Sequence, residues 1–309
     1  MDNRRFNQRG QGGQRPAGHQ SPESTSPMHS SHDGKNAPGR ITCTPLPKSV
    51  NDLACELINS KRFQNSGLLM QKYSACRIKT GENELSSLEG KGKREFLQIL
   101  VNQQSDRLVQ IVEHSFSRWC EMLGGLGSDW HTEKFSAKTR WRMVVGLGSG
   151  SVLETAMTMH PVYGFPYIPG SSLKGLTRAW AEAESGVNKK LIDDIFGPAE
   201  SQDASQGKVI FFDAMPKKLP ELEIDIINPH YKDYYEDKAP PANWLSPNPV
   251  YFLAIAPGAH FHFAVASKQK ELADRAIAWL KAGLDKYGIG SKTLVGYGHF
   301  DVPQSDKSG

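Results

Sequence analysis

A Gly-Ser-Ser turn that opens a predicted helix is the first part of the sequence whose residues could do chemistry. Residues 166–178 read PYIPGSSLKGLTR. A side-chain oxygen of Ser171 or Ser172 can cap the helix, and the N–H groups of its first turn then point outward. Lys174 and Arg178 are four residues apart and share one helix face. These groups together predict a site for an anion such as phosphate. An ordinary capped helix with two solvated cations fits the same residues.

A glycine-rich segment near the C-terminus is the second candidate. Residues 287–300 read YGIGSKTLVGYGHF, in which two Gly-x-Gly pairs flank five residues. Glycine is required where the backbone takes a positive φ, or where another backbone or a phosphate approaches closely. Lys292 could meet a phosphate, and Tyr297 and His299 could stack on a base. A dinucleotide-binding fingerprint is excluded because the segment follows a predicted helix and leads to a strand. A glycine-rich connection without a ligand is the alternative.

A third segment, residues 224–235, runs from a predicted strand into an aromatic and charged loop that ends near Trp244. Asp225, His230 and Asp233 could in principle hold a metal ion, but their spacing matches no standard set of ligands. The loop, Tyr231 to Trp244, suits a contact with protein or RNA equally well. We therefore expect no metal ion and no cofactor.

The histidines raise the question of catalysis. A metal-independent RNase needs a base for the 2′-hydroxyl and a cation for the developing charge, which His160 and Lys174 could supply. His260 and His262 alternate on a predicted strand and so share one sheet face. A polar residue on a turn or a strand is the simpler interpretation of each. The sequence holds no Gly-x-Ser-x-Gly or His-Glu-x-x-His motif, which leaves little to support a hydrolase.

The hydrophobic pattern predicts the framework that positions these segments. From Ser49 to Gly125 apolar residues recur at helical spacing, and a long helix is expected to begin near Lys93 and to end at Gly124 and Gly125. After Trp130 short apolar runs alternate with Gly and Pro. We expect strands at residues 140–146, 208–214, 223–227, 250–255 and 260–266, and helices at 171–184 and 270–286. This order of elements predicts an α+β fold rather than a doubly wound sheet.

Composition limits the classes of function. The 309 residues carry 37 Lys and Arg against 33 Asp and Glu, a formal charge of +4, which permits a polyanionic partner without demanding one. No apolar run approaches the roughly 18 residues that a membrane helix needs. No secretory signal is expected at the start, so we expect a cytoplasmic protein without a membrane partner. The four cysteines include no Cys-x-x-Cys pair and are expected to be reduced.

Residues 1–40 differ from the rest, because they are dominated by Gly, Gln, Ser, Pro, Asn and Arg. They can bury too little apolar surface to offset the entropy of ordering, so we expect a disordered tail. Its Arg- and Gly-rich stretch at residues 4–13 could touch RNA while remaining flexible. A passive solubilising tail fits equally well.

Two of these segments resemble a known family. The loop Gly288-x-Gly290-x5-Gly296-x-Gly298 resembles that of the RAMP superfamily of CRISPR proteins, and IPGSSLKG at residues 168–175 matches the superfamily's segment residue for residue. The pair FG at 196–197 also fits. Within the superfamily, NPHY at 228–231 followed by YY at 234–235 resembles the sixth-subunit family of the Cmr complex, the type III-B RNA-guided effector. The resemblance extends over residues 138–302.

The resemblance implies a ferredoxin-like (RRM-like) RAMP core at residues 131–309. The helical pattern adds a lobe at 41–130, expected to pack on this core, and the tail at 1–40 departs from the family, which does not settle its role. The resemblance also implies a non-catalytic, RNA-binding subunit that holds the 3′ region of the CRISPR guide RNA and contributes to antiviral defence. Its expected partners are the guide RNA and the backbone, small and capping subunits of the complex. The residues expected to contact RNA are Ser171, Ser172, Lys174, Arg178, Gly288, Gly290, Ser291, Lys292, Gly296, Tyr297 and Gly298.

Two other functions stay open. A guide-processing endoribonuclease of the same superfamily shares the glycine-rich loop. The helix at 171–184 contains no His, so this function would have to recruit His160 or His230. The other function is that of an assembly module whose basic residues contact only protein.

Overall fold

The computed structural model describes residue 44, residues 46–60, residue 63, and residues 65–78, 85–102, 105–184, 186–198, 205–228, 240 and 249–303. The chain divides into Met1–Asn36 and Ala37–Gly309, and all described residues belong to the second unit. The expected tail at 1–40 lies outside the described residues. So does nearly all of the Tyr231 to Trp244 loop, including Asp233, and so does His230.

Two long antiparallel strands form the centre of the main sheet. β3 (His131–Thr139) pairs with β8 (His260–Ser267), from His131 opposite Ser267 to Lys138 opposite His260. β4 (Val209–Phe211) and β5 (Met215–Pro216) pair with β8, and β9 (Phe300–Asp301) pairs with β3. The strand order is β4-β8-β3-β9, antiparallel throughout. With the helices around it, this sheet makes the chain an α+β protein, as the sequence predicts.

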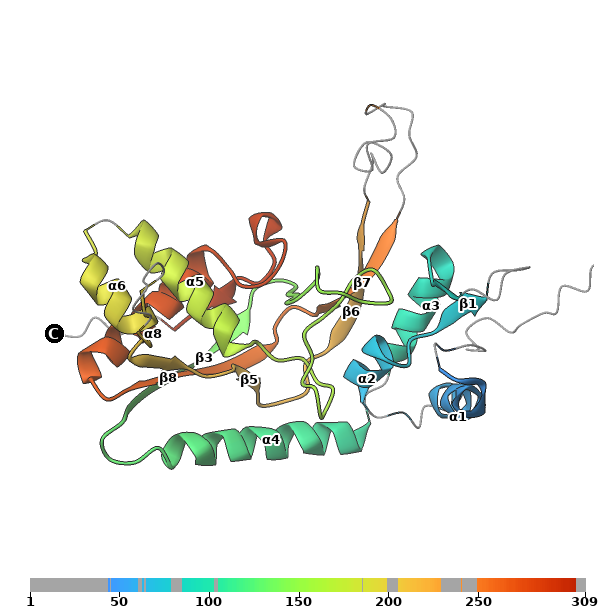
Figure 1. The fold of residues 1–309 in the computed structure, drawn as a ribbon, viewed down its shortest axis with the longest axis horizontal. Helices are drawn as coiled ribbons and strands as arrows, with labels where there is room; N and C mark the ends of the chain where they lie inside the picture. The colour runs from blue at the N-terminus through green and yellow to red at the C-terminus, as the bar shows by residue number, and fades with distance from the viewer. Residues whose placement is uncertain are drawn as a thin grey trace, which may run out of the picture. The chain divides into compact units, whose positions relative to one another are not determined.

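Helices cover both faces of this sheet (Figure 1). α5 (Gly170–Ala183), α6 (Lys189–Phe196) and α8 (Lys270–Lys286) lie on one face, and α4 (Asp106–Gly124) runs along the other. Strand residues alternate between the two sides. Phe261 and Phe263 are fully buried on the α8 side, whereas Ala264 packs into the smaller cluster beneath α4. Each buried phenylalanine contributes about 2 kcal/mol to folding.

The remaining elements include two further two-stranded antiparallel sheets. One consists of β1 (Cys76–Ile78) and β2 (Leu85–Ser87), and α1 (Lys48–Asn59), α2 (Ser66–Gln71) and α3 (Gly90–Val101) precede α4 along the chain. α3 packs against the other sheet, the antiparallel hairpin of β6 (Leu222–Ile227) and β7 (Val250–Ile255), which Figure 1 shows beside it. Among the described residues, no helix is both long and apolar enough to span a membrane.

Two expectations for the elements are wrong. The first sheet strand is β3 at 131–139, and not 140–146, because β3 reads HTEKFSAKT and lacks the apolar run that marks a buried strand. Residues 140–146 instead form irregular chain with one bridge, between Met143 and Ile255, and within this segment Met143 to Val145 are buried. The helix expected from Lys93 is two helices, α3 and α4, and the Ser105 side chain caps α4 by accepting the N–H of Leu108 at 3.2 Å. The expected helix end at Gly124 is confirmed.

Candidate nucleic-acid interface

The glycine-rich loop joins α8 to β9, and all four of its paired glycines have positive φ: 71° at Gly288, 90° at Gly290, 96° at Gly296 and 68° at Gly298. Another group also lies close to two of these glycines, but it is the protein's own backbone and not a phosphate. A Cβ on Gly290 would lie 2.2 Å from the carbonyl oxygen of Val144, and one on Gly298 would lie 1.9 Å from that of Ile289. A Cβ on Gly296 would meet nothing within 4 Å.

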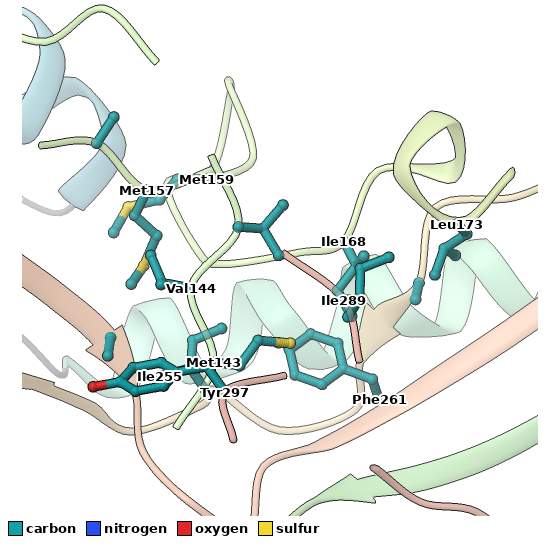
Figure 2. Close-up of a cluster of buried hydrophobic side chains, with 14 of the residues drawn as sticks. Met143, Val144, Met157, Met159, Ile168, Leu173, Ile255, Phe261, Ile289 and Tyr297 are labelled. Carbon is teal, nitrogen blue, oxygen red and sulfur yellow. The ribbon is translucent and has the colours of Figure 1, made fainter. Parts of the chain in front are cut away.

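Backbone hydrogen bonds fix the base of this loop to the core. The N–H of Ile289 donates to the carbonyl of Gly298 at 2.9 Å, and the N–H of Gly298 donates to Arg142 at 2.8 Å. The N–H of Ser291 donates to Val144 at 2.8 Å. Figure 2 shows Ile289 of the loop in the same buried cluster as Val144, and this cluster also contains residues that lead into α5. The base of the loop is therefore hydrogen-bonded to the irregular segment at residues 140–146.

The middle of the loop projects as a short 3-10 turn, η1 (Thr293–Val295). Lys292, just before it, adopts a left-handed conformation with φ 63°. Leu294 is fully exposed, and Val295 is 67% exposed. Both ring nitrogens of His299 lie 3.1 Å from carbonyl oxygens, one of Asp285 and one of Thr293. The protein's own backbone thus holds the imidazole in place, and its stacking on a base stays a prediction.

Tyr297 does not form the stacking platform that the sequence predicts. Its side chain is only 6% exposed, and its hydroxyl donates to the carboxylate of Asp225 on β6. Burial, together with this carboxylate, raises the pKa of Tyr297 to about 12. The ammonium of Lys292 lies 5.3 Å from the Tyr297 ring centroid and 5.1 Å from that of Phe252, which is a cation–π arrangement. Because the ring is enclosed, no base can stack on it in this structure.

Asp225 takes part in an ionic network at the base of the β6–β7 hairpin. Its carboxylate lies 3.4 Å from Nε of Arg142, and the same nitrogen donates to Glu223. The carboxylate therefore links the hairpin to the loop, while His230 and Asp233, the other two candidate metal ligands, lie outside the described residues. Within the part of the chain that the structure describes, no three His, Cys, Asp or Glu side chains are grouped so as to hold a metal ion.

The start of α5 is capped differently from the prediction. Neither Ser171 nor Ser172 accepts a capping hydrogen bond, and the N-cap residue is Pro169. The N–H of Gly170 instead donates to Oδ1 of Asp213 at 2.7 Å. The first turn already faces a carboxylate, so the predicted phosphate site at the first-turn N–H groups is wrong in this form.

The two cations of α5 have different environments. Lys174 is partly exposed and makes no ion pair with any described residue. Arg178 donates from Nε to Glu182 at 2.7 Å and from a terminal nitrogen to the carbonyl of Gly197 at 3.2 Å. Arg178 therefore ties α5 to the turn after α6. Lys174 is the one of the two that is placed to meet an external anion.

His160 stabilises a turn. Its Nδ1 accepts the backbone N–H groups of Val162 and Tyr163, both at 3.3 Å, and its ring stacks on Tyr163 with centroids 4.7 Å apart. Burial lowers the pKa of His160. The nitrogen that would act as a base is thus already an acceptor for two backbone groups.

Sequence reasoning missed Asp213, Arg142 and the contact between Asp225 and Tyr297. Glu223 and Asp225 alternate along β6, which was a usable signal for a charged strand face. Asp213 has no such signal, because it meets α5 only through the packing of β4.

Comparisons with known proteins identify the family of this chain. The family model of the RAMP superfamily matches residues 134–301. The CRISPR system Cmr subunit Cmr6 of Pyrococcus furiosus is 31% identical, and the match covers 61% of this chain and 72% of that protein. Cmr6 of Saccharolobus solfataricus is 27% identical over 80% of this chain and 84% of its own length.

A solved structure, the cryo-EM structure of the type III-B Cmr-beta bound to cognate target RNA, contains a chain with 27% identity and a TM-score of 0.55. That match covers 69% of this chain and 71% of the other. The chain therefore belongs to the RAMP superfamily and is a Cmr6-like member of it.

Proposed function

We propose that this chain is a subunit of a type III-B CRISPR effector, the Cmr complex, in which it binds RNA without cutting it. The similarity to two Cmr6 proteins and to a chain of the Cmr-beta structure supports membership of the complex. The family resemblance extends the proposal to the 3′ region of the guide RNA as the bound segment. The backbone, small and capping subunits are then its protein partners.

The main sheet supports a ferredoxin-like core for this subunit. Along the chain β3, α5, β4, β8, α8 and β9 follow the order βαββαβ, and their strands are neighbours in the order β4-β8-β3-β9. A ferredoxin-like fold has this order of elements. α6 and the β6–β7 hairpin are then insertions, and residues 41–130 supply the helical lobe, whose last helix, α4, covers the free face of the sheet.

The observation that carries RNA binding is the exposed turn of the glycine-rich loop on a fixed base. Because the base is bonded to the core beforehand, little loop entropy is lost when a ligand binds. We assign phosphate contacts to Lys174 and Lys292, whose ammonium groups have no carboxylate partner among the described residues. Ser171, Ser172, Ser291 and the backbone at Gly296 are the neighbouring polar groups. Contacts to phosphate and sugar suit a guide of variable sequence.

The environment of His160 supports a subunit that does not cut RNA. A general base needs a free lone pair within reach of the 2′-hydroxyl. Nδ1 of His160 uses its lone pair on two backbone N–H groups instead. The turn at residues 160–164 accounts for this histidine without any reaction.

An assembly module is the second candidate, and the tip of the loop favours it. Leu294 and Val295 expose apolar side chains to solvent next to the residues assigned to RNA. Exposed apolar side chains that are held together on a projecting turn are suited to a pocket on a partner protein. The same loop could thus contact a neighbouring subunit through its tip.

The test is a binding and cleavage assay of the purified full chain with a labelled single-stranded, guide-like RNA in EDTA. We expect a salt-sensitive shift on native gels and intact RNA on denaturing gels. Lys174→Glu combined with Lys292→Glu should weaken binding about tenfold, which is about 1.4 kcal/mol. The matched control is Lys189→Glu with Lys190→Glu, because both lysines are exposed on α6 and the net charge changes equally.

Three results would contradict parts of the proposal. If both pairs of Lys→Glu substitutions weaken RNA binding equally, Lys174 and Lys292 make no specific contact with RNA. The loss would then be a general effect of charge. Discrete cleavage that His160→Ala abolishes would make the chain a processing nuclease. No RNA binding, together with complex assembly that Leu294→Ser disrupts, would favour the assembly module.

A further inference from the structure

A cavity of about 520 Å³ lies at the end of the main sheet where β8 begins, on the face that also carries α4. Its walls come from β8, from the segment after β5 and from the turn between β7 and β8. The polar lining consists mainly of Ser136, Lys217, Lys218, His260 and His262. None of these residues belongs to the glycine-rich loop or to α5.

The register of the sheet explains why polar groups gather there. Ser136 on β3 lies opposite His262 on β8, and Lys138 lies opposite His260. Residues directly opposite each other share a sheet face. The apolar contact of α4 with this face reaches His262, whose ring centroid is 4.5 Å from that of Phe116. Beyond it, Ser136, Lys138 and His260 are exposed.

Positive charge exceeds negative charge around the cavity. Lys217 and Lys218 are exposed and make no ion pair with described residues, and Glu221 is the acidic residue of the described lining. Lys138 reaches the rim, since a Cβ on Gly258 would lie 3.5 Å from its Cε. Burial, and then the neighbouring charges of Lys217 and His260, lower the pKa of His262. A bound anion would relieve this crowding of cations.

Leu219, Pro220 and Pro257 add apolar surface to the lining of the cavity. A cavity of this volume that is lined by both apolar side chains and a few polar groups is typical of sites for small ligands. A nucleotide has both of the required parts, a flat base and an anionic phosphate. RNA-binding proteins hold single-stranded bases in this way, with a planar or apolar surface for the base and cations for the backbone.

We propose that this cavity holds one nucleotide of a single-stranded RNA, with the phosphate at Lys217, Lys218 and His260 and the base against Leu219 and His262. The inference rests on the proposed RNA-binding function, and it adds a second contact outside the loop and α5. It predicts that RNA reaches the α4 face of the sheet.

The experiment crosslinks the full chain to a short single-stranded RNA that contains 4-thiouridine and maps the crosslinked peptides by mass spectrometry. We expect crosslinks within residues 217–221 and 256–262. Lys217→Glu with Lys218→Glu should remove these crosslinks and weaken RNA binding at least fivefold. The control pair Lys189→Glu with Lys190→Glu should leave the crosslinks in place. Circular dichroism and thermal melting confirm that both variants are folded.

A second measurement separates this inference from the proposed function. Uridine monophosphate and inorganic phosphate are titrated separately into the full chain, and the ring resonances of His260 and His262 are followed by NMR, assigned with His260→Gln and His262→Gln. We expect saturable shifts with the nucleotide, at lower concentration than with phosphate alone, and a raised pKa of His262 in the complex.

The two measurements give four distinct outcomes. RNA binding with crosslinks only at the loop and α5 would overturn the cavity and keep the proposed function. Nucleotide shifts without any RNA binding would keep the cavity as a site for a free nucleotide and overturn the proposed function. If the chain neither binds RNA nor shows shifts with the nucleotide, the cavity and the proposed function are both overturned. Equal effects of the two lysine pairs on the mapped crosslinks would also overturn the cavity.

Discussion

Gly298→Ala separates two explanations of the glycine-rich loop. If the glycines exist to let RNA approach the main chain, alanine should weaken RNA binding and leave folding intact. If they exist because the protein's own backbone approaches, alanine should destabilise the fold. The structure favours the second explanation at Gly298, where a Cβ would lie 1.9 Å from the carbonyl oxygen of Ile289, well inside the 3.4 Å at which ordinary contact begins.

The magnitude follows from two contributions. An L-residue with the left-handed φ of 68° costs about 1–2 kcal/mol. Relief of the clash requires the backbones of Gly298 and Ile289 to separate, which sacrifices their 2.9 Å hydrogen bond and the 2.8 Å bond to Arg142. Each of these contributes about 1 kcal/mol. We therefore expect a loss of about 3–4 kcal/mol in the free energy of unfolding.

Gly296→Ala is the matched control. Gly296 has φ 96°, and a Cβ there would meet nothing within 4 Å, so the variant suffers the conformational penalty of about 1–2 kcal/mol without the clash. Urea unfolding of both variants, followed by tryptophan fluorescence, measures the difference. Equal stabilities, or a Gly298→Ala variant of normal stability that no longer binds RNA, would refute the reasoning.

Two further predictions concern the groups that hold the loop and α5. Asp213→Ala should lower the free energy of unfolding by about 1 kcal/mol, because Gly170 loses the acceptor that caps α5, and Asp213→Asn should restore most of it in the same urea assay. The pKa of Tyr297 is raised to about 12 from 10.0, so the stability it contributes is present below pH 10 and is lost as the pH rises toward 12. The stability advantage of the wild type over Tyr297→Phe should therefore shrink by about 2 kcal/mol across that window, and an advantage that does not change with pH would show that burial and the Asp225 carboxylate do not raise the pKa of the hydroxyl.

Local sequence chemistry predicts the parts of this structure that depend on neighbouring residues. The positive φ of the paired glycines and the ends of α5 and α8 depend on one or two turns of chain, and they are found where the sequence places them. The prediction that His260 and His262 lie on the same face of a strand follows from strand alternation and is also confirmed. The anion site at the start of α5 fails, because the capping carboxylate of Asp213 comes from 43 residues further along the chain.

Contacts between residues far apart in the sequence also explain why the position of β3 and the exposure of Tyr297 are predicted wrongly. β3 contains few apolar residues because one of its faces is polar. The nearest apolar run lies within residues 140–146, so the hydrophobic pattern predicts the strand there. The apolar run there, Met143 to Val145, is buried because the glycine-rich loop packs on it. Tyr297 lies between glycines, which suggests exposure, but the burial of its ring depends on the register of β6 with β7 and on the place of Asp225 there.

The burial of Tyr297 changes what the RNA-binding proposal predicts about affinity. A stacking platform would give binding that depends on base identity and resists salt. With the ring enclosed, the groups that we assign to RNA are the ammonium groups of the half-buried Lys174 and Lys292, hydroxyls and backbone amides, which contact phosphate and sugar. For single strands the slope of log affinity against log salt is about −0.7 for each phosphate neutralised. Binding by the loop and α5 should thus be steep in salt and nearly indifferent to base composition, and removal of either lysine should reduce that slope by about 0.7. A slope that stays unchanged would place the RNA contact elsewhere on the chain.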